Sequence, residues 1–284
     1  MAHLGDPGPL AGRYHYSAEN LVTAVESSGI SEGEVVFLTA GLGNLGIPSR
    51  SESFEELSRL AVEVIIDVVG SRGGVLVPTY SYSFGGAVGR PEGIPVFDVQ
   101  HTPSTLGVFS EWFRSTMAEG RSRDPMVSVA ALGAGAVDVI QDVPPTSYGH
   151  GSIFERLLTT KSGVLNLGMG PRWTPFIHYV DFLCQVPHRY EKTFSGIIRS
   201  AGKDSTVAWT YHVPVRIPNA RGLGEGNGQA ALSKGLWDET RIGRSRILHA
   251  DYNRYFDFTM KRTQADPWNL AVGPPIDLEG IPRD

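Results

Sequence analysis

The chain has 284 residues, of which 41% are hydrophobic, so it can bury the core of one large domain or of two smaller ones. Its formal net charge of −5 and its pI near 5.9 argue against a surface that binds nucleic acid. The single cysteine, Cys184, excludes an intrachain disulfide and a zinc site built from several thiolates, and it fits a reducing compartment.

The first residues show no signal-peptide pattern, and no apolar run approaches the roughly 18 residues that a membrane span needs. A short basic cluster, formed by Arg241, Arg244 and Arg246, is typical of a solvated surface. We therefore expect a cytoplasmic protein whose partners are neither nucleic acids nor membranes.

The first half of the chain alternates between short apolar runs and amphipathic stretches. Helical spacing of apolar residues predicts helices over residues 18–30 and 53–69, with a buried strand over residues 34–40 between them. Ser53 is placed to cap the second of these helices and Gly70 to end it.

The alternation continues beyond residue 70. Strands are predicted over residues 73–84, 126–133 and 163–170. Helices are predicted over residues 104–117, 136–142 and 151–161, and Ser104 and Ser152 are placed to cap the first and the last of these.

This order of elements predicts an α/β fold with a central mixed, largely parallel sheet and helices on both faces. After residue 195 the pattern changes. Residues 205–217 alternate as in an antiparallel strand, residues 222–228 are expected to form a flexible loop or a hairpin end, and residues 251–264 are expected to form a helix. We interpret this part as a C-terminal elaboration, and since no linker separates it, we expect residues 1–284 to form a single domain.

A glycine motif follows the first predicted strand. Gly41, Gly43 and Gly46 have the G-x-G-x-x-G spacing of a dinucleotide-binding loop. However, Pro48 and several polar residues separate this motif from the next helix, and the next strand ends at Pro78 without an acidic residue that could bind a ribose. A tight connection between strand and helix explains the glycines equally well, although such a loop also lets the backbone approach a ligand closely.

Six motifs in a fixed order resemble the aminoglycoside 3-N-acetyltransferase family. They cover about residues 18–196 and read VVFLTAGLGNLG, GGVLVPTYSYSF, FDVQHTPSTLGVFSEWFR, RSRDPMVSVAALG, YGHGSIFERL and GVLNLGMG, followed by HYVD. The resemblance implies an enzyme that uses acetyl-CoA to acylate an amine, with the donor beside the glycine loop. The donor-binding residues that it implies are Thr39, Gly41, Gly43, Pro78, Thr79 and Ser128.

The sequence departs from the family pattern at three places. The first loop, from Thr39 to Gly46, lacks two hydroxyl residues, Asp124 stands where the family has histidine, and the H-x-x-E motif reads His178 to Asp181. The stretch HYVDFLCQVPHRYEKTFSG is more similar to family members associated with sugar or natural-product biosynthesis than to members that confer antibiotic resistance.

His178 is the strongest candidate for a general base, because the unperturbed pKa of histidine lies near the working pH. If residues 176–183 form a helix, His178 and Asp181 are i,i+3 neighbours on one face. A carboxylate in that position can fix the imidazole tautomer and stabilise the imidazolium. The alternative is an ordinary, partly buried histidine, because isolated i,i+3 pairs are common.

Several polar residues have two interpretations each. Ser128 could place a hydroxyl near the thioester or could be an ordinary strand-edge serine. Asp98 could orient the acceptor amine or could fill a turn, and Asp124 could hold a cationic acceptor or could bond only to the backbone. We expect residues 188–196, including Tyr190, to be a polar loop at the lip of the acceptor site.

Two other kinds of site are disfavoured. The histidines show no H-E-x-x-H spacing and no thiolates support them, so no metal is expected. Cys184 follows His178 by six residues, which places the two side chains on nearly opposite sides of a helix, so we expect Cys184 to be a core residue.

The leading hypothesis is an N-acyltransferase that transfers an acyl group from CoA, or from a carrier-protein thioester, to an amine of a small molecule or amino sugar in biosynthesis. The first alternative is a family relative repurposed for a non-acetyl condensation or cyclisation, which the three departures motivate. The second is a protein of the same fold that only binds its ligand. The sequence does not identify the acceptor.

Overall fold

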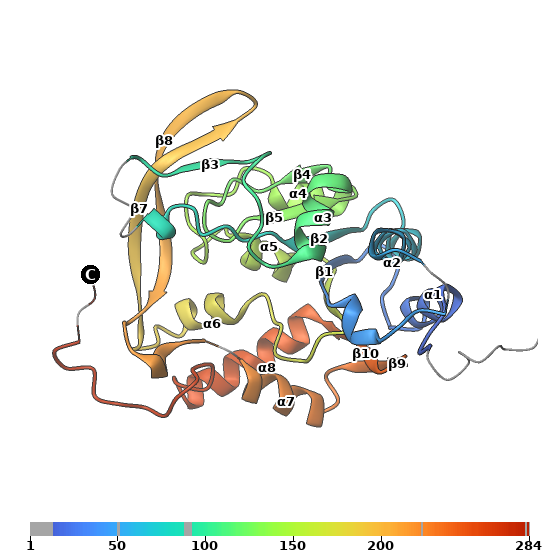
Figure 1. The fold of residues 1–284 in the computed structure, drawn as a ribbon. Helices are drawn as coiled ribbons and strands as arrows, with labels where there is room; N and C mark the ends of the chain where they lie inside the picture. The colour runs from blue at the N-terminus through green and yellow to red at the C-terminus, as the bar shows by residue number, and fades with distance from the viewer. Residues whose placement is uncertain (1–13, 50–51, 88–92, 223, 282, 284) are drawn as a thin grey trace, which may run out of the picture.

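A seven-stranded mixed sheet forms the centre of the molecule, and a separate three-stranded sheet stands beside it (Figure 1). The computed structural model describes residues 14–49, 52–87, 93–222, 224–281 and 283. The strand order of the large sheet is β4-β5-β2-β1-β6-β10-β9 and that of the small sheet is β3-β7-β8.

In the large sheet, parallel pairing is confined to the three central strands. β1 (Val35–Ala40) pairs in parallel with β2 (Gly74–Pro78) on one side and with β6 (Ser162–Leu167) on the other. The pairings outside these three are antiparallel. They add the strands β4 (Gly120–Arg121), β5 (Val129–Leu132), β10 (Ser245–Asp251) and β9 (Asp238–Ile242). The predicted mixed α/β fold is confirmed, and the C-terminal part does more than elaborate it, because β9 and β10 complete the central sheet.

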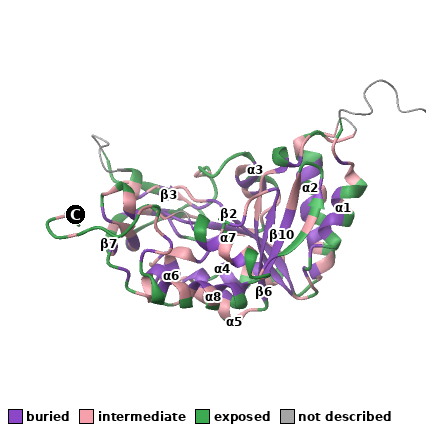
Figure 2. Cartoon of the chain, turned by 90° about the horizontal axis from the view of Figure 1, so that it is seen from below, coloured by how far each residue is buried: buried purple, intermediate pink, exposed green. Residues whose placement is uncertain are grey.

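Consecutive residues of the central strands point into two different cores. Val35 and Phe37 of β1 belong to one buried cluster, whereas Val36 and Leu38 belong to the other. Figure 2 shows the buried strands enclosed between layers of helices. One face is covered by α1 (Ala18–Glu26), α2 (Phe54–Val69) and α3 (Val108–Thr116). The other face is covered by α4 (Ala134–Ile140), α5 (Ile153–Thr159), α6 (Ile177–Leu183) and α8 (Tyr252–Ala265), and α7 (Glu225–Ser233) contributes to the same core.

The helix caps agree with the sequence in part. Ser53 caps α2 through a reciprocal capping box with Glu56, as predicted, and Gly70 ends that helix. The prediction that Ser104 caps α3 is wrong, because its hydroxyl accepts the N–H of Leu106 in a local turn and α3 begins only after Gly107, whose φ is 102°. Ser152 does precede α5, but its hydroxyl makes no capping bond.

Two long strands form a hairpin that projects from the body (Figure 1). β7 (Arg189–Ser200) and β8 (Lys203–Pro214) pair antiparallel along their whole length, and β3 (Val96–Asp98) pairs in parallel with β7. The predicted polar loop over residues 188–196 is therefore wrong, because these residues are mostly strand. The predicted loop over residues 222–228 is also partly wrong, because α7 begins at Glu225.

Short 3-10 segments complete the described secondary structure. They are η1 (Leu42–Leu45), η2 (Gly85–Ala87) and η3 (Pro218–Ala220). None of the helices in the described ranges combines the length and apolar character that crossing a bilayer requires.

Because the two cores share the strands of one sheet, we expect the chain to unfold as a single domain. Trp112 lies in one core and Trp237 in the other. Variants that retain Trp112 or Trp237 as their single tryptophan should therefore show the same denaturation midpoint by fluorescence as by far-ultraviolet circular dichroism. Separate midpoints, or limited proteolysis that releases two folded halves, would contradict this expectation.

Candidate active site

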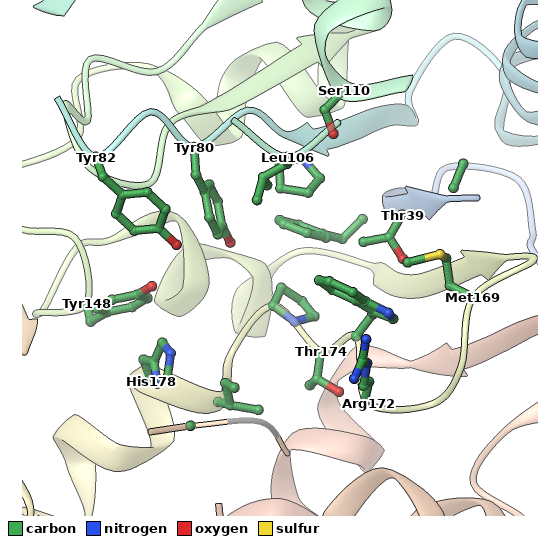
Figure 3. A pocket seen from close by; sticks show the side chains of 17 residues that line it. Thr39, Tyr80, Tyr82, Leu106, Ser110, Tyr148, Met169, Arg172, Thr174 and His178 are labelled. Atoms are coloured by element: carbon green, nitrogen blue, oxygen red, sulfur yellow. The ribbon is translucent and has the colours of Figure 1, made fainter. Parts of the chain in front are cut away.

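A pocket of ≈ 300 Å³ lies at the carboxyl ends of β1, β2 and β6 (Figure 3). The crevice outside the carboxyl ends of parallel strands is the usual place for a ligand in an open α/β sheet. Its wall is formed by strand ends, by the connections that follow them, and by the first turn of α6. The lining residues are Phe37, Thr39, Ala40, Pro78, Tyr80, Tyr82, Leu106, Ser110, Tyr148, Met169, Arg172, Trp173, Thr174, Pro175, Ile177, His178 and Gly222.

Three of the residues assigned from the sequence line this pocket. They are Thr39 at the end of β1, Pro78 at the end of β2, and His178 in α6. The others are absent from the described lining, namely Gly41, Gly43, Thr79, Asp98, Asp124, Ser128, Asp181 and Tyr190.

His178 and Asp181 form a hydrogen-bonded pair on one face of α6. Nδ1 of His178 lies 3.1 Å from Oδ2 of Asp181, and since a carboxylate only accepts, Nδ1 carries the proton that it shares with Asp181. This tautomer leaves the lone pair on Nε2 free. The ring of Tyr148 meets the imidazole edge-on, with 5.4 Å between the ring centroids. Asp181 therefore fixes the orientation of a neutral imidazole that lines the pocket.

The electrostatic surroundings keep His178 neutral. Burial lowers the pKa of His178 to about 4, and the nearby positive charge of Arg189 adds to this effect, whereas Asp181 opposes it. Arg189 begins β7 and is itself buried, with its Nε 3.7 Å from Oδ2 of Asp181. Its Nη2 donates to the carbonyl oxygen of His212, which fixes the guanidinium beneath the pair.

The glycine loop lies next to the pocket at the end of β1. Residues Leu42–Leu45 form η1, and the amide of Asn44 donates to the carbonyl oxygen of Gly168 at 2.8 Å, which ties the loop to the end of β6. A Cβ atom built on Gly43 would meet no atom within 4 Å, so the backbone there is open to a ligand.

Thr79 and Ser128 lie beneath the pocket floor in a buried network. Oγ of Ser128 donates to the carbonyl oxygen of Thr79 at 2.8 Å, and Nε of Arg121 lies 3.1 Å from both hydroxyls. Both residues are fully buried. Burial lowers the pKa of Arg121 to about 10, and this guanidinium also bonds to the carbonyl oxygens of Val99 and Thr102. The network connects β2 and β5 to the segment after β3.

The three candidates for acceptor binding are engaged elsewhere. Asp98 accepts the backbone N–H groups of Gln100 and His101, both at 2.9 Å, as a turn aspartate does. Oδ1 of Asp124 accepts two backbone N–H groups, and burial nevertheless raises its pKa to about 6. Tyr190 is half-buried in β7, opposite Val213.

Sequence reasoning missed most of the aromatic wall. Tyr80 and Tyr82 follow β2, Tyr148 precedes α5, and Trp173 lies between β6 and α6. Figure 3 shows the hydroxyl groups of the three tyrosines directed toward the space near His178. Tyr148 belongs to the YGHG motif, which was a usable signal, but these side chains come from different connections and no sequence spacing relates them.

Among the residues that the structure describes, no group of three or more His, Cys, Asp and Glu side chains is arranged to hold a metal ion. Cys184, at the C-terminal end of α6, is half-buried, with its Sγ 3.9 Å from Sδ of Met260.

Several solved structures have the same fold, and some of them are named aminoglycoside acetyltransferases. Aminoglycoside acetyltransferase AAC(3)-Xa superposes with a TM-score of 0.72 at 23% identity, covering 87% of this chain and 92% of that one. AAC-IIIb, solved as a binary complex with CoASH, gives 0.72 at 20% identity, with 92% and 100% covered. The YokD protein from Bacillus subtilis gives 0.72 at 18% identity, with 89% and 95% covered. At these identities the similarity establishes the fold. No curated protein matches the sequence.

The sequence itself establishes the family. The profile of the family described as aminoglycoside 3-N-acetyltransferase matches residues 49–264, which is well over half of the chain. The chain belongs to this family. It is an amine acetyltransferase, as the sequence predicted, and acetyl-CoA fits this family as the cosubstrate.

Gly222 keeps the imidazole in place. A Cβ atom built on Gly222 would lie 2.6 Å from Cε1 of His178, too close for either group to stay where it is. We expect Gly222→Ala to displace the ring and to lower kcat by about tenfold or more, because small misplacements of reacting groups are costly. Gly226→Ala is the matched control, since its Cβ would meet nothing within 4 Å. Unchanged kcat in Gly222→Ala, measured at an unchanged melting temperature, would contradict this role.

Arg189 should control the protonation of His178. Replacing it by Gln removes a positive charge that disfavours the imidazolium, so the pKa of His178 should rise from about 4, whereas Arg189→Lys should hold it low. Titration of the His178 Cε1–H resonance by NMR measures this directly. Arg199→Gln, an exposed change in the same strand, should leave it unmoved. A pKa that stays the same in Arg189→Gln would show that burial alone sets it.

Proposed function

We propose that this chain acetylates a primary amine of a small molecule with His178 as general base and Asp181 as the residue that orients it. The observation that supports this most is the 3.1 Å contact between His178 and Asp181 on the pocket wall, with the imidazole neutral near pH 7. A neutral imidazole can accept a proton, and the carboxylate stabilises the charge that results.

The thioester is placed between the ends of β1 and β2, near Thr39 and Pro78, and the phosphates lie toward the glycine loop. The openness at Gly43 supports this placement, as does Arg172, a cation on the pocket lining at the end where Thr39 and Met169 lie (Figure 3). Thr79 and Ser128 support the floor of this donor site from below and do not contact the donor.

The reaction balances without any further group. The amine nitrogen bonds to the thioester carbonyl carbon, and the carbon–sulfur bond breaks with its electron pair leaving on sulfur. The proton lost by nitrogen passes to Nε2 of His178 and then to the departing thiolate, which gives an amide and free CoA. The contact with Asp181 lets the imidazole hold this proton in between.

The replacement of Glu by Asp at position 181 no longer supports the alternative of an enzyme repurposed for another reaction. The shorter side chain still reaches His178, so replacing Glu by Asp has not separated the pair.

A biosynthetic role rather than resistance is supported by the sequence of residues 178–196. The single cysteine supports a cytoplasmic location. A carrier-protein thioester is the alternative donor, because it presents the same type of pantetheine arm.

His178→Ala should lower kcat by roughly 10²–10⁴-fold, the usual contribution of a positioned base. Asp181→Asn should cost less, because the imidazole survives and only its orientation and charge stabilisation suffer. Release of CoA from acetyl-CoA, with mass detection of the acetylated amine, measures both effects. His101→Ala, a change at an exposed turn, is the control. If His178→Ala keeps near wild-type turnover, the assignment of the base is wrong.

A further inference from the structure

The residues that the structure describes in the pocket lining carry little charge, and none of it is negative. Among the described lining residues there is no Asp or Glu, and the one permanent charge is that of Arg172. That guanidinium lies 4.0 Å from Glu225 and stacks on Trp173, away from the His178 end. A ligand with several ammonium groups would therefore lose its hydration here and find no carboxylate in the lining to replace it.

The three carboxylates that the sequence analysis proposed for the site do not offer a free charge to a ligand in the pocket. Asp181 is buried beneath His178, and Asp124 is buried and occupied by backbone N–H groups. Asp98 is held by the turn at Gln100 and His101. Asp124 and Asp181 cannot pair with a cationic sugar without losing contacts that the fold uses, and Asp98 does not line the pocket.

Aromatic rings, and not carboxylates, line the end of the pocket where the amine must approach His178. Tyr80 and Tyr82 meet edge-to-face with 6.0 Å between centroids, and Tyr148 meets His178 in the same way. Such surfaces accept a flat ring through stacked or edge contacts. They can also hold a single ammonium group against a ring face before it loses its proton.

Tyr82 is held in its place at a cost to the backbone. Its φ is 50°, a left-handed conformation that residues other than glycine seldom adopt, and its N–H and that of Ser81 both donate to the carbonyl oxygen of Met126. Strained residues of this kind gather at ligand-binding sites. The strain here positions an aromatic ring that is still 39% exposed and lines the pocket.

We infer that the acceptor is a primary amine joined to an aromatic ring by a short alkyl chain, with at most one positive charge, and not a polycationic aminoglycoside. This inference rests on the proposed acetyl transfer and narrows its substrate class. The hydroxyl groups of Tyr80, Tyr82 and Tyr148 add hydrogen-bonding capacity at the same end, so a ring that bears a hydroxyl group also fits.

The test compares 2-phenylethylamine and tyramine with sisomicin. Binding to the CoA-loaded protein is measured by calorimetry, and kcat/KM is measured with acetyl-CoA. Both arylalkyl amines should bind in the millimolar range or tighter, and the better of them should exceed sisomicin in kcat/KM by at least tenfold. Sisomicin binding as tightly as the arylalkyl amines, or no binding of either arylalkyl amine at millimolar concentration, would overturn the inference.

Two variants test the physical reasons. Tyr82→Leu keeps apolar bulk but removes a ring, so it should raise KM for 2-phenylethylamine by about three- to tenfold, as expected for one lost ring contact. Tyr14→Leu, which is similarly exposed and outside the lining, should not. Leu106→Glu, which adds a carboxylate to the lining, should improve sisomicin binding severalfold, whereas Leu106→Gln should not. An unchanged KM in Tyr82→Leu would contradict the role of the ring.

Failure of the proposed function looks different. In that case acetyl-CoA neither stabilises the protein against heat nor loses its acetyl group to any of the amines tested, whether arylalkyl amine or amino sugar. Acetylation of sisomicin in preference to the arylalkyl amines would leave the proposed function intact and remove only the inference about the acceptor.

Discussion

The parallel pairing of β1 with β2 on one side and β6 on the other is the constraint on which the site depends. Because the three strands run in the same direction, their carboxyl ends meet at one edge of the sheet, and everything that follows them must turn there. Thr39, Pro78 and the segment that leads from β6 to α6 converge for this reason. The antiparallel strands on either side complete the sheet, and none of their described residues lines the pocket.

The His178 site combines a local and a distant contribution. Helical geometry alone brings Asp181 within reach of the imidazole, because i and i+3 side chains share a face. The protonation of the pair depends also on a distant residue, because Arg189 of β7 lies buried beside Asp181 and brings a positive charge close to the imidazole. Burial, to which the charge of Arg189 adds, lowers the pKa of His178 to about 4, so the imidazole is uncharged near pH 7 and is a weaker base than the histidine with a pKa near the working pH that the sequence predicted.

The sequence was sufficient where the determinants are local. The strands over β1, β2 and β6, the cap at Ser53 and the pairing of His178 with Asp181 all follow from periodicity or spacing within a few residues. The family motifs also located the pocket edge, through Thr39 and Pro78.

The sequence was insufficient where tertiary contacts decide. Residues 188–196 look like a polar loop because their charges suggest exposure, yet pairing with β8 makes them a strand and buries Arg189. Ser128 lies in a family motif, but a motif does not say which side of its strand faces the ligand, and here the hydroxyl faces Thr79. The tyrosines that line the pocket come from separate connections, so only the folded chain brings them together.

The part of the pocket wall where we propose that the acceptor binds comes from three separate parts of the chain. The connection between β2 and α3 supplies Tyr80, Tyr82 and Leu106, the connection between α4 and α5 supplies Tyr148, and α6 supplies His178. Under the proposed mechanism, substitutions in the first of these segments would change which amines are accepted and would leave the His178–Asp181 pair untouched. Such a division would let a new acceptor specificity arise through a few codon changes without loss of the acetyl-transfer chemistry.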